Sequence, residues 1–228
     1  MVGRTVGVRE FSMTAALVAR GVLEDDFGVR AADVRWRYGP ADAGDSHPIV
    51  RMKPHDIELE PLADGSNLSD ALRDGEIDAL VAYKPPPAFL EGAPNVDRLF
   101  VDYETIEADY ARRTGIFPIM HLLGIQREIA ERDPELCLRV CDAFEASRRY
   151  AVERTSESQA PFTSLPWAPN EAERSRQVLG DNYWTYGVNA NRPALESLCQ
   201  YSFAQGISAR PVTVDELFAA ATMGWAPS

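Results

Sequence analysis

The chain has 228 residues, of which 45% are hydrophobic and 25% are charged, and its formal net charge is −12 at pH 7. This length accommodates one large domain or two small lobes, each able to bury a core. The ordinary composition is typical of a soluble globular protein. The negative charge argues against binding to nucleic acid or to an acidic membrane surface. An anionic ligand would therefore need local positive groups to overcome the overall field.

The cysteine count and the N-terminus bear on the compartment. The three cysteines, Cys137, Cys141 and Cys199, do not have the spacing of a disulfide framework. Cys137 and Cys141 share a face of a predicted helix with no further metal ligand nearby, so buried thiols are the favoured interpretation. The sequence has no apolar run of about 18 residues and no signal-peptide pattern at its start. We therefore expect a cytoplasmic protein that does not bind a membrane.

The chain up to Tyr83 alternates between strand and helix patterns. A β-branched strand is predicted over Thr5–Val8, followed by a helix over about Ser12–Leu23 that Ser12 or Thr14 can cap. The next elements are predicted in chain order as a strand over Val34–Tyr38, a loop over Gly39–Pro54, a strand over Ile57–Leu59, a capped helix over Asn67–Asp74 and a strand over Ile77–Tyr83. This alternation predicts an α/β fold with a parallel sheet and right-handed crossovers.

The second half is richer in helices. The run Lys84-Pro-Pro-Pro87 interrupts the pattern and is typical of a boundary or hinge. Strands are predicted over Val96–Val101 and Phe117–Ile125. Helices are predicted over Tyr103–Arg112, Glu135–Thr155, Asn170–Leu179, Arg192–Gln205 and Val214–Ala221, with Asp133 capping the second of them and Pro134 at its first position. These helices either pack on one another or cover a sheet that this chain does not fully contain.

Two short segments of the chain carry candidate binding groups. At the first of them, Glu10, Ser12, Met13 and Thr14 lie where a strand turns into a helix, whose free N–H groups and positive dipole end suit a carboxylate. The alternative interpretation is that Ser12 only caps its own helix. Lys84 follows an apolar strand, and cations at the carboxyl ends of parallel strands point into a cleft.

The second segment is Arg112–His121. Arg113 can hold a carboxylate bidentately beside the Thr114-Gly115 turn, although a lone arginine is often only a surface residue. His121 can donate a proton near neutral pH, or it can be a structural histidine. Farther along, Trp184 and Tyr186 can stack on an aromatic ring or pack between helices.

Five stretches of the chain are similar to segments of one known family. They are Gly7–Ala15, Asp74–Leu80, Arg112–His121, Leu165–Trp167 and Asp181–Gly187. In these stretches the chain resembles the 4,5-dihydroxyphthalate decarboxylase family, and the ten residues of Arg112–His121 do so almost letter for letter. The similarity runs over nearly the whole chain.

The resemblance implies the two-lobed α/β fold of type II periplasmic binding proteins, with the ligand in the cleft. Residues 1–100 would form the second lobe, and residues 101–228 would form the crossing segment and the C-terminal helical part of the first lobe. Relative to the family, about half a lobe would be missing at the N-terminus. Three causes stay open, namely a start codon assigned too late, a split gene whose other part is a separate chain, and a truncated relic. The partners compatible with this arrangement are further copies of the chain in a homo-oligomer, or a separate chain that supplies the missing half-lobe.

The resemblance also implies a reaction, the non-oxidative decarboxylation of a hydroxylated aromatic carboxylic acid. His121 or Glu10 would be the general acid, and a glutamic acid in that role needs a pKa raised by burial. The substrate-binding residues would be Ser12, Met13, Thr14, Lys84, Arg113, Thr114, Trp184 and Tyr186. The partner would be a small aromatic carboxylate.

Other functions and cofactors stay open at this point. The same cleft would also serve a solute-binding protein that captures a small aromatic or carboxylate ligand without turnover, or a different lyase or dehydratase. The sequence has no dinucleotide fingerprint and no phosphate loop, so no organic cofactor is predicted. A divalent metal is conceivable in the loop with His47 and His55, although a solvated loop is the favoured interpretation.

Overall fold

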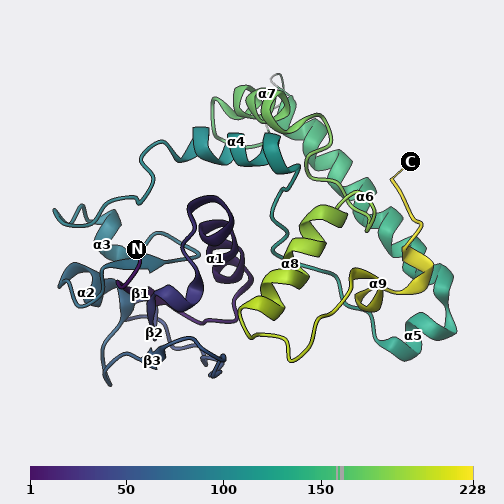
Figure 1. The fold of residues 1–228 in the computed structure, drawn as a ribbon. Helices are drawn as coiled ribbons and strands as arrows, with labels where there is room; N and C mark the ends of the chain where they lie inside the picture. The colour runs from purple at the N-terminus through teal and green to yellow at the C-terminus, as the bar shows by residue number, and fades with distance from the viewer. Residues whose placement is uncertain (158, 160–161, 228) are drawn as a thin grey trace. The chain divides into compact units, whose positions relative to one another are not determined.

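A computed structural model describes residues 1–157, 159 and 162–227, and the chain divides into two compact units (Figure 1). Unit 1 comprises Met1–Val101 and Leu198–Pro211, and unit 2 comprises Asp102–Ser197 and Val212–Ser228. The division falls after Val101 and not at the proline run, which leads into the short helix α3 (Pro87–Leu90). The two units are described separately below.

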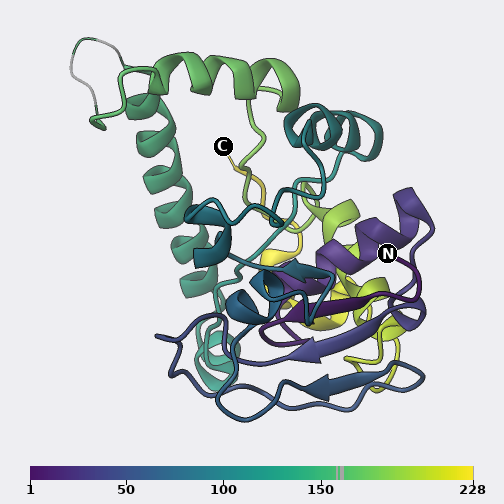
Figure 2. The same ribbon diagram turned by 90° about the vertical axis from the view of Figure 1, so that its left-hand side faces the viewer.

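Unit 1 is built on a parallel sheet of four strands, as the alternating pattern predicts (Figure 2). The strands are β1 (Thr5–Val8), β2 (Arg35–Tyr38), β3 (Leu59–Pro61) and β4 (Ala79–Val81), and their order is β3-β2-β1-β4. The prediction is confirmed in full for β1. For β3 and β4 it is displaced or too long, because an apolar run does not show where the hydrogen-bonded ladder stops.

The register of β1 sorts its side chains onto two apolar faces. Val6 and Val8 lie on the same face as Trp36, where they pack with Phe11 and with Ala16 of helix α1 (Thr14–Phe27). Gly7 lies on the other face, beside Leu80 and under helix α2 (Leu68–Arg73). A Cβ atom on Gly7 would lie 2.6 Å from Ile77 Cδ1 and 2.7 Å from Leu68 Cδ2. Glycine at this position therefore lets α2 approach the sheet closely.

The ends of α1 and α2 show which capping predictions hold. Helix α1 ends as expected at Phe27, with Gly28 in the left-handed conformation at φ 65°. Its N-cap, however, is Met13, which makes no side-chain cap. The predicted Ser12 or Thr14 cap is wrong, because Ser12 Oγ instead donates to Glu10 Oε1 at 2.8 Å and Thr14 is already helical. Helix α2 has the predicted cap, with Asn67 Oδ1 accepting from the Asp70 N–H at 3.0 Å.

A C-terminal segment completes unit 1. Helix α8 spans Arg192–Ala204, and its last turns pack on α1, where the ring of Tyr201 lies over Gly21. The Tyr201 hydroxyl donates to Asp25, and Gln205 donates through Nε2 to the Leu17 carbonyl at 3.1 Å. A short 3-10 helix, η1 (Ala31–Asp33), leads into β2.

The regular elements of unit 2 are all helices within its described residues, and irregular segments connect them. Its elements are α4 (Tyr103–Thr114), α5 (Arg127–Arg132), α6 (Pro134–Ser156), α7 (Ala168–Leu179), the first part of α8, α9 (Val214–Leu217) and the 3-10 helix η2 (Ala220–Thr222). Helix α6 packs against α5, α7 and η2, and α4 packs against α7. Asp133 caps α6 as predicted, since its Oδ1 accepts from the Leu136 N–H at 3.0 Å. Helix α5 was not predicted.

Two predicted strands are absent from the described chain. Val96–Val101 and Phe117–Ile125 both run as irregular backbone without ladder pairing. An apolar run becomes a strand only when a neighbouring strand pairs with its N–H and C=O groups, and for Phe117–Ile125 unit 2 offers none within its described residues. Leu122 and Leu123 in the second segment are accordingly 62% and 59% exposed. In the described residues we find no helix long and apolar enough to cross a membrane.

Candidate functional site

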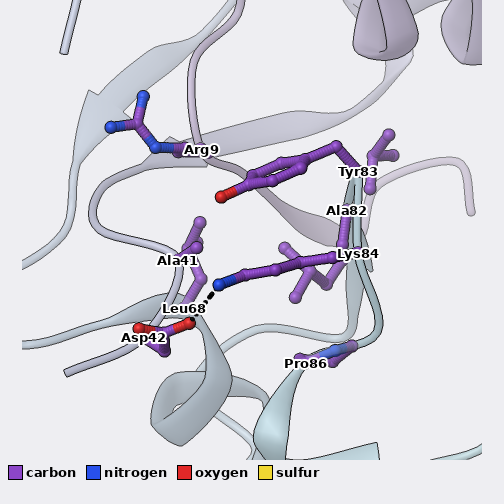
Figure 3. A pocket seen from close by; sticks show the side chains of 10 residues that line it. Arg9, Ala41, Asp42, Leu68, Ala82, Tyr83, Lys84 and Pro86 are labelled. Atoms are coloured by element: carbon purple, nitrogen blue, oxygen red, sulfur yellow. Dashed lines mark ion pairs between the residues drawn. The ribbon is translucent and has the colours of Figure 1, made fainter. Parts of the chain in front are cut away.

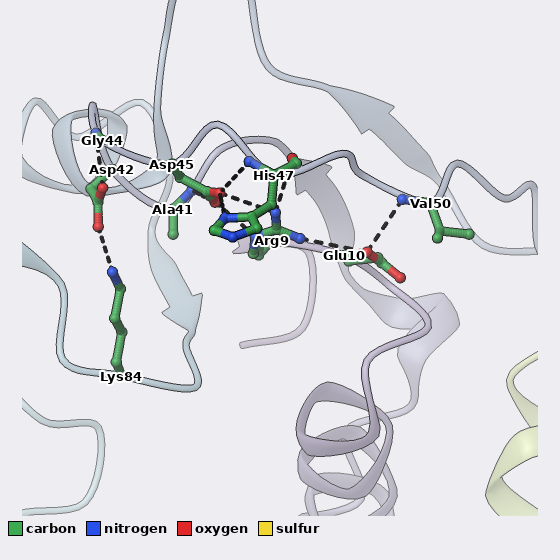
Figure 4. Close-up of polar contacts among 9 residues, drawn as sticks. All are labelled: Arg9, Glu10, Ala41, Asp42, Gly44, Asp45, His47, Val50 and Lys84. Carbon is green, nitrogen blue, oxygen red and sulfur yellow. Dashed lines mark hydrogen bonds and ion pairs between the residues drawn. The ribbon is translucent and has the colours of Figure 1, made fainter. Parts of the chain in front are cut away.

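Charged side chains gather at the edge of the unit 1 sheet where the strands end. Because β1, β2 and β4 are parallel, their carboxyl ends lie on one edge, which is where ligands bind in open α/β sheets. Arg9 and Glu10 follow β1, Asp42 and Asp45 follow β2, and Lys84 follows β4 (Figure 4). We refer to these five residues as the edge cluster.

The most buried part of the edge cluster is the ion pair of Arg9 with Asp45. Arg9 donates through Nε at 2.7 Å and through Nη2 at 3.0 Å to the two carboxylate oxygens of Asp45. Asp45 also accepts from the backbone N–H groups of Ala41 at 2.9 Å and His47 at 3.2 Å. The hydrogen bond from Arg9, followed by these backbone bonds, holds the pKa of Asp45 far below its usual range. The pair therefore fixes the loop after β2 against the end of β1.

Glu10 ties a second part of the same loop to the strand end. Its carboxylate accepts from Ser12 Oγ at 2.8 Å and from the Val50 N–H at 3.2 Å, and it lies 3.5 Å from Arg9 Nη1. In these contacts Glu10 is only an acceptor. It thus sets the position of the turn between β1 and α1.

Lys84 is the cation of the edge cluster that solvent reaches most easily. Its Nζ lies 2.8 Å from Asp42 Oδ2, and this hydrogen bond raises the pKa of Lys84 and lowers that of Asp42. The side chain of Lys84 is 49% exposed. Beside it lies a small open hollow, which is lined by Arg9, Asp42, Leu68, Tyr83 and Lys84 among others (Figure 3). An incoming anion can therefore compete with Asp42 for the ammonium group.

The start of α1 lies next to the edge cluster in sequence. The first hydrogen bond along the helix runs from the Leu17 N–H to the Met13 carbonyl at 2.9 Å. The N–H groups of Thr14, Ala15 and Ala16 precede it and have no partner within the helix. No acidic residue lies in the first turn. The Met13 side chain packs against the apolar core.

In unit 2, Arg113 and Thr114 form the end of α4. The Thr114 hydroxyl donates to the Tyr110 carbonyl at 2.7 Å and accepts from the Ile116 N–H at 3.1 Å, so both of its functions are used locally. Gly115 closes the helix in the left-handed conformation. Arg113 Nε lies 3.5 Å from Asp109, and the guanidinium carbon lies 5.9 Å from the centre of the Tyr110 ring.

An aromatic contact brings two of the motifs in unit 2 together. The ring of Phe117, within the Arg112–His121 motif, lies 5.3 Å from the ring of Trp184 and 6.0 Å from that of Tyr183. Trp184 remains 55% exposed, so much of its surface is open to a partner ring. Tyr186 instead meets Phe144 edge to face at 6.3 Å. His121 is exposed on the irregular segment that follows Phe117.

The predicted residues are thus divided between the units. Unit 1 holds Glu10, Ser12, Met13, Thr14 and Lys84, and unit 2 holds Arg113, Thr114, His121, Trp184 and Tyr186. Sequence reasoning missed Arg9, Asp42, Asp45 and Tyr83. Their signal was their place close behind the ends of β1 and β4 and in the loop after β2, which only the strand order makes meaningful. No group of three or more potential metal ligands is found in the described chain.

Two proteins of known name are similar to this chain. A 4,5-dihydroxyphthalate decarboxylase from Comamonas testosteroni is 33% identical over 222 residues, which is 97% of this chain and 67% of that protein. The chain belongs to the 4,5-dihydroxyphthalate decarboxylase family. A second protein of that name, from Pseudomonas putida, is 35% identical over 111 residues, or 48% of this chain and 43% of that protein. No family profile matches the chain. Named members of this family are carboxy-lyases.

Proposed function

We propose that this protein is a carboxy-lyase that removes one carboxylate from a hydroxylated aromatic dicarboxylic acid, with 4,5-dihydroxyphthalate as the first substrate to test. The observation that carries the proposal is the 33% identity to a 4,5-dihydroxyphthalate decarboxylase along 97% of the chain. Two features of unit 1 support it, because the exposed ammonium group of Lys84 in the edge cluster and the start of α1, which no described side chain caps, can each attract a carboxylate.

The chemistry sets three demands on the protein. In 4,5-dihydroxyphthalate each carboxylate has a hydroxyl group para to it, which pushes electron density onto the ring carbon that carries the carboxylate. A general acid protonates that carbon, the bond to the carboxylate breaks, and carbon dioxide leaves as the ring regains its aromaticity. The protein must therefore hold the carboxylates, supply one proton and exclude water.

In this proposal the groups of unit 1 hold the carboxylates. Lys84 and the free N–H groups at the start of α1, with Thr14, bind one anionic group. Ser12 and Met13 shape the same turn. Arg9 does not bind the substrate in this proposal, since its guanidinium is already bound to Asp45. Its role is to hold the loop after β2 in place. No step of the proposal requires a metal or an organic cofactor.

In this proposal the groups of unit 2 bind the aromatic ring of the substrate and supply the proton. Trp184 stacks on the substrate ring, and Arg113 contributes a second carboxylate contact. Tyr186 and Thr114 support this part, because their contacts are with Phe144 and with the end of α4. His121 is the preferred general acid, and Glu10 is the second candidate. The proposal includes the two-lobed fold of type II periplasmic binding proteins.

The test is decarboxylation by the purified full chain. We expect release of carbon dioxide and of 3,4-dihydroxybenzoate from 4,5-dihydroxyphthalate, measured by gas trapping and by chromatography. Replacement of His121 by alanine should lower kcat on the order of 100-fold if it is the general acid. His55→Ala, which alters an exposed histidine in the loop after β2, is the matched control and should have little effect. Binding of the substrate without any turnover would refute the proposal.

A further inference from the structure

Arg20 of α1 is a buried arginine without an acidic partner. Only 1% of its surface is exposed. Its Nε donates to Gln205 Oε1 at 2.6 Å, and its Nη2 donates to the Phe11 carbonyl at 2.7 Å. The guanidinium carbon lies 3.6 Å from the centre of the Phe11 ring and 5.4 Å from that of Trp36. Nη1 is buried with no hydrogen-bond partner, and no carboxylate contacts Arg20 within the described residues.

A buried arginine without a counter-ion lowers the stability of the folded protein. A buried charge is normally paired, because transfer from water to the protein interior is unfavourable unless a counter-ion compensates it. Burial lowers the pKa of Arg20 to about 9, which still leaves the guanidinium charged at neutral pH. All its partners are neutral amides, carbonyls or rings, so its positive charge is not cancelled. A methionine or leucine would fill the same space against Phe11 without that cost.

The position of the charge indicates what it acts on. Through the Phe11 carbonyl, Arg20 holds the turn between Glu10 and Ser12, directly before the free N–H groups of α1. The edge cluster beside this turn contains two cations and three carboxylates. Arg20 therefore offsets the one surplus negative charge, which would otherwise oppose an incoming carboxylate. Low-polarity surroundings let its field reach farther than in water.

We propose that Arg20 is a positioning residue for the carboxylate seat at the start of α1, where it fixes the turn through Phe11 and where its positive charge, which has no counter-ion of its own among the described residues, offsets the surplus negative charge of the edge cluster. The proposal rests on the function proposed above, because it assigns the seat to a substrate carboxylate. Gln205 has a matching role in this proposal. Its neutral amide oxygen accepts from Arg20 and so holds the guanidinium without neutralising its charge.

The test replaces Gln205 with glutamate in the full chain. Gln205→Glu keeps an oxygen acceptor for Arg20 Nε but adds the missing counter-ion. The matched control is Gln200→Glu, which makes the same charge change at an exposed position of α8. The probe is phthalate, which lacks the activating hydroxyls, and its Kd is measured by calorimetry. KM and kcat for 4,5-dihydroxyphthalate and the unfolding midpoint are measured in parallel.

We expect Gln205→Glu to remain folded and to raise both the Kd for phthalate and the KM on the order of 10-fold, with kcat little changed. Gln200→Glu should stay within about twofold of the unmodified protein. Arg20→Gln, which removes the charge directly, should weaken phthalate binding to a similar degree. A folded variant of either kind with unchanged Kd would overturn the inference, and so would failure of both variants to fold, which would assign Arg20 a structural role alone.

Two further outcomes separate this inference from the proposed function. If the unmodified protein does not bind phthalate, the carboxylate seat is wrong and the inference fails with it. If it binds phthalate, and Gln205→Glu weakens that binding, but no carbon dioxide is released, the inference stands and the proposed reaction fails.

Discussion

Replacing Asp45 with asparagine should destabilise the protein strongly, although the change is nearly isosteric. The side chains of Asp45 and Arg9 are only 4% and 11% exposed, and Asp45 accepts two bonds from Arg9 and two from backbone N–H groups. Breaking a buried ion pair by removing one charge costs about 3–5 kcal/mol. Glu10, 3.5 Å from Arg9 Nη1, compensates part of the loss. We therefore expect a loss of about 3 kcal/mol in the free energy of unfolding.

The pH dependence of the free energy of unfolding provides a second, independent test of the ion pair between Arg9 and Asp45. Because the folded protein lowers the pKa of Asp45, its contribution to stability is present above the unfolded pKa of about 4 and is lost as the pH falls below it. The loss from Asp45→Asn should thus be largest at neutral pH and should shrink as the medium is acidified toward about pH 2.

Urea unfolding followed by tryptophan fluorescence measures both effects, since Trp36 is buried in the same unit. Asp64→Asn, which alters an exposed carboxylate of unit 1, is the control and should change stability by less than about 0.5 kcal/mol. The reasoning is refuted if the two variants are equally stable at pH 7, or if the loss from Asp45→Asn does not depend on pH.

Three further changes test other parts of the structure. Gly21→Ala should lower the free energy of unfolding by about 1–3 kcal/mol, because a Cβ atom would lie 2.4 Å from the Tyr201 ring. Its control is Gly124→Ala, which places no described atom within 4 Å of the new Cβ. Equal stability of the two variants would contradict the packing of α8 on α1. Asn67→Ala should cost about 1 kcal/mol through loss of the α2 cap, and no change in the urea midpoint would argue against that cap. Lys84→Ala should raise the KM for 4,5-dihydroxyphthalate about 10-fold in steady-state assays, whereas Lys53→Ala, which removes the other lysine of the chain, should not; equal effects would exclude a specific role for Lys84.

The sequence predicted those features of the fold that depend on neighbouring residues. The strand Thr5–Val8 and the caps at Asn67 and Asp133 are confirmed, because each depends on a few adjacent side chains and their own backbone. The parallel sheet is confirmed because alternation of strands and helices favours it strongly.

The failures concern features that need a distant partner. The apolar run Phe117–Ile125 has the composition of a strand but no neighbouring strand to pair with in the described chain. Arg9 and Asp45 are 36 positions apart, and Arg20 and Gln205 are 185 apart, so periodicity gives no indication of either contact. The predicted Ser12 cap of α1 fails for a different, local reason, since Ser12 Oγ donates to Glu10 two residues away and the helix cap is Met13.

The proposal that the start of α1 and the end of β4 bind a substrate carboxylate can be tested most directly by NMR titration of the isotopically labelled full chain with phthalate. The account predicts that the largest shifts fall on the backbone N–H groups of Thr14, Ala15 and Lys84, with saturation at one equivalent of ligand. Saturable shifts confined to residues remote from the edge cluster, or no shifts at all, would contradict it.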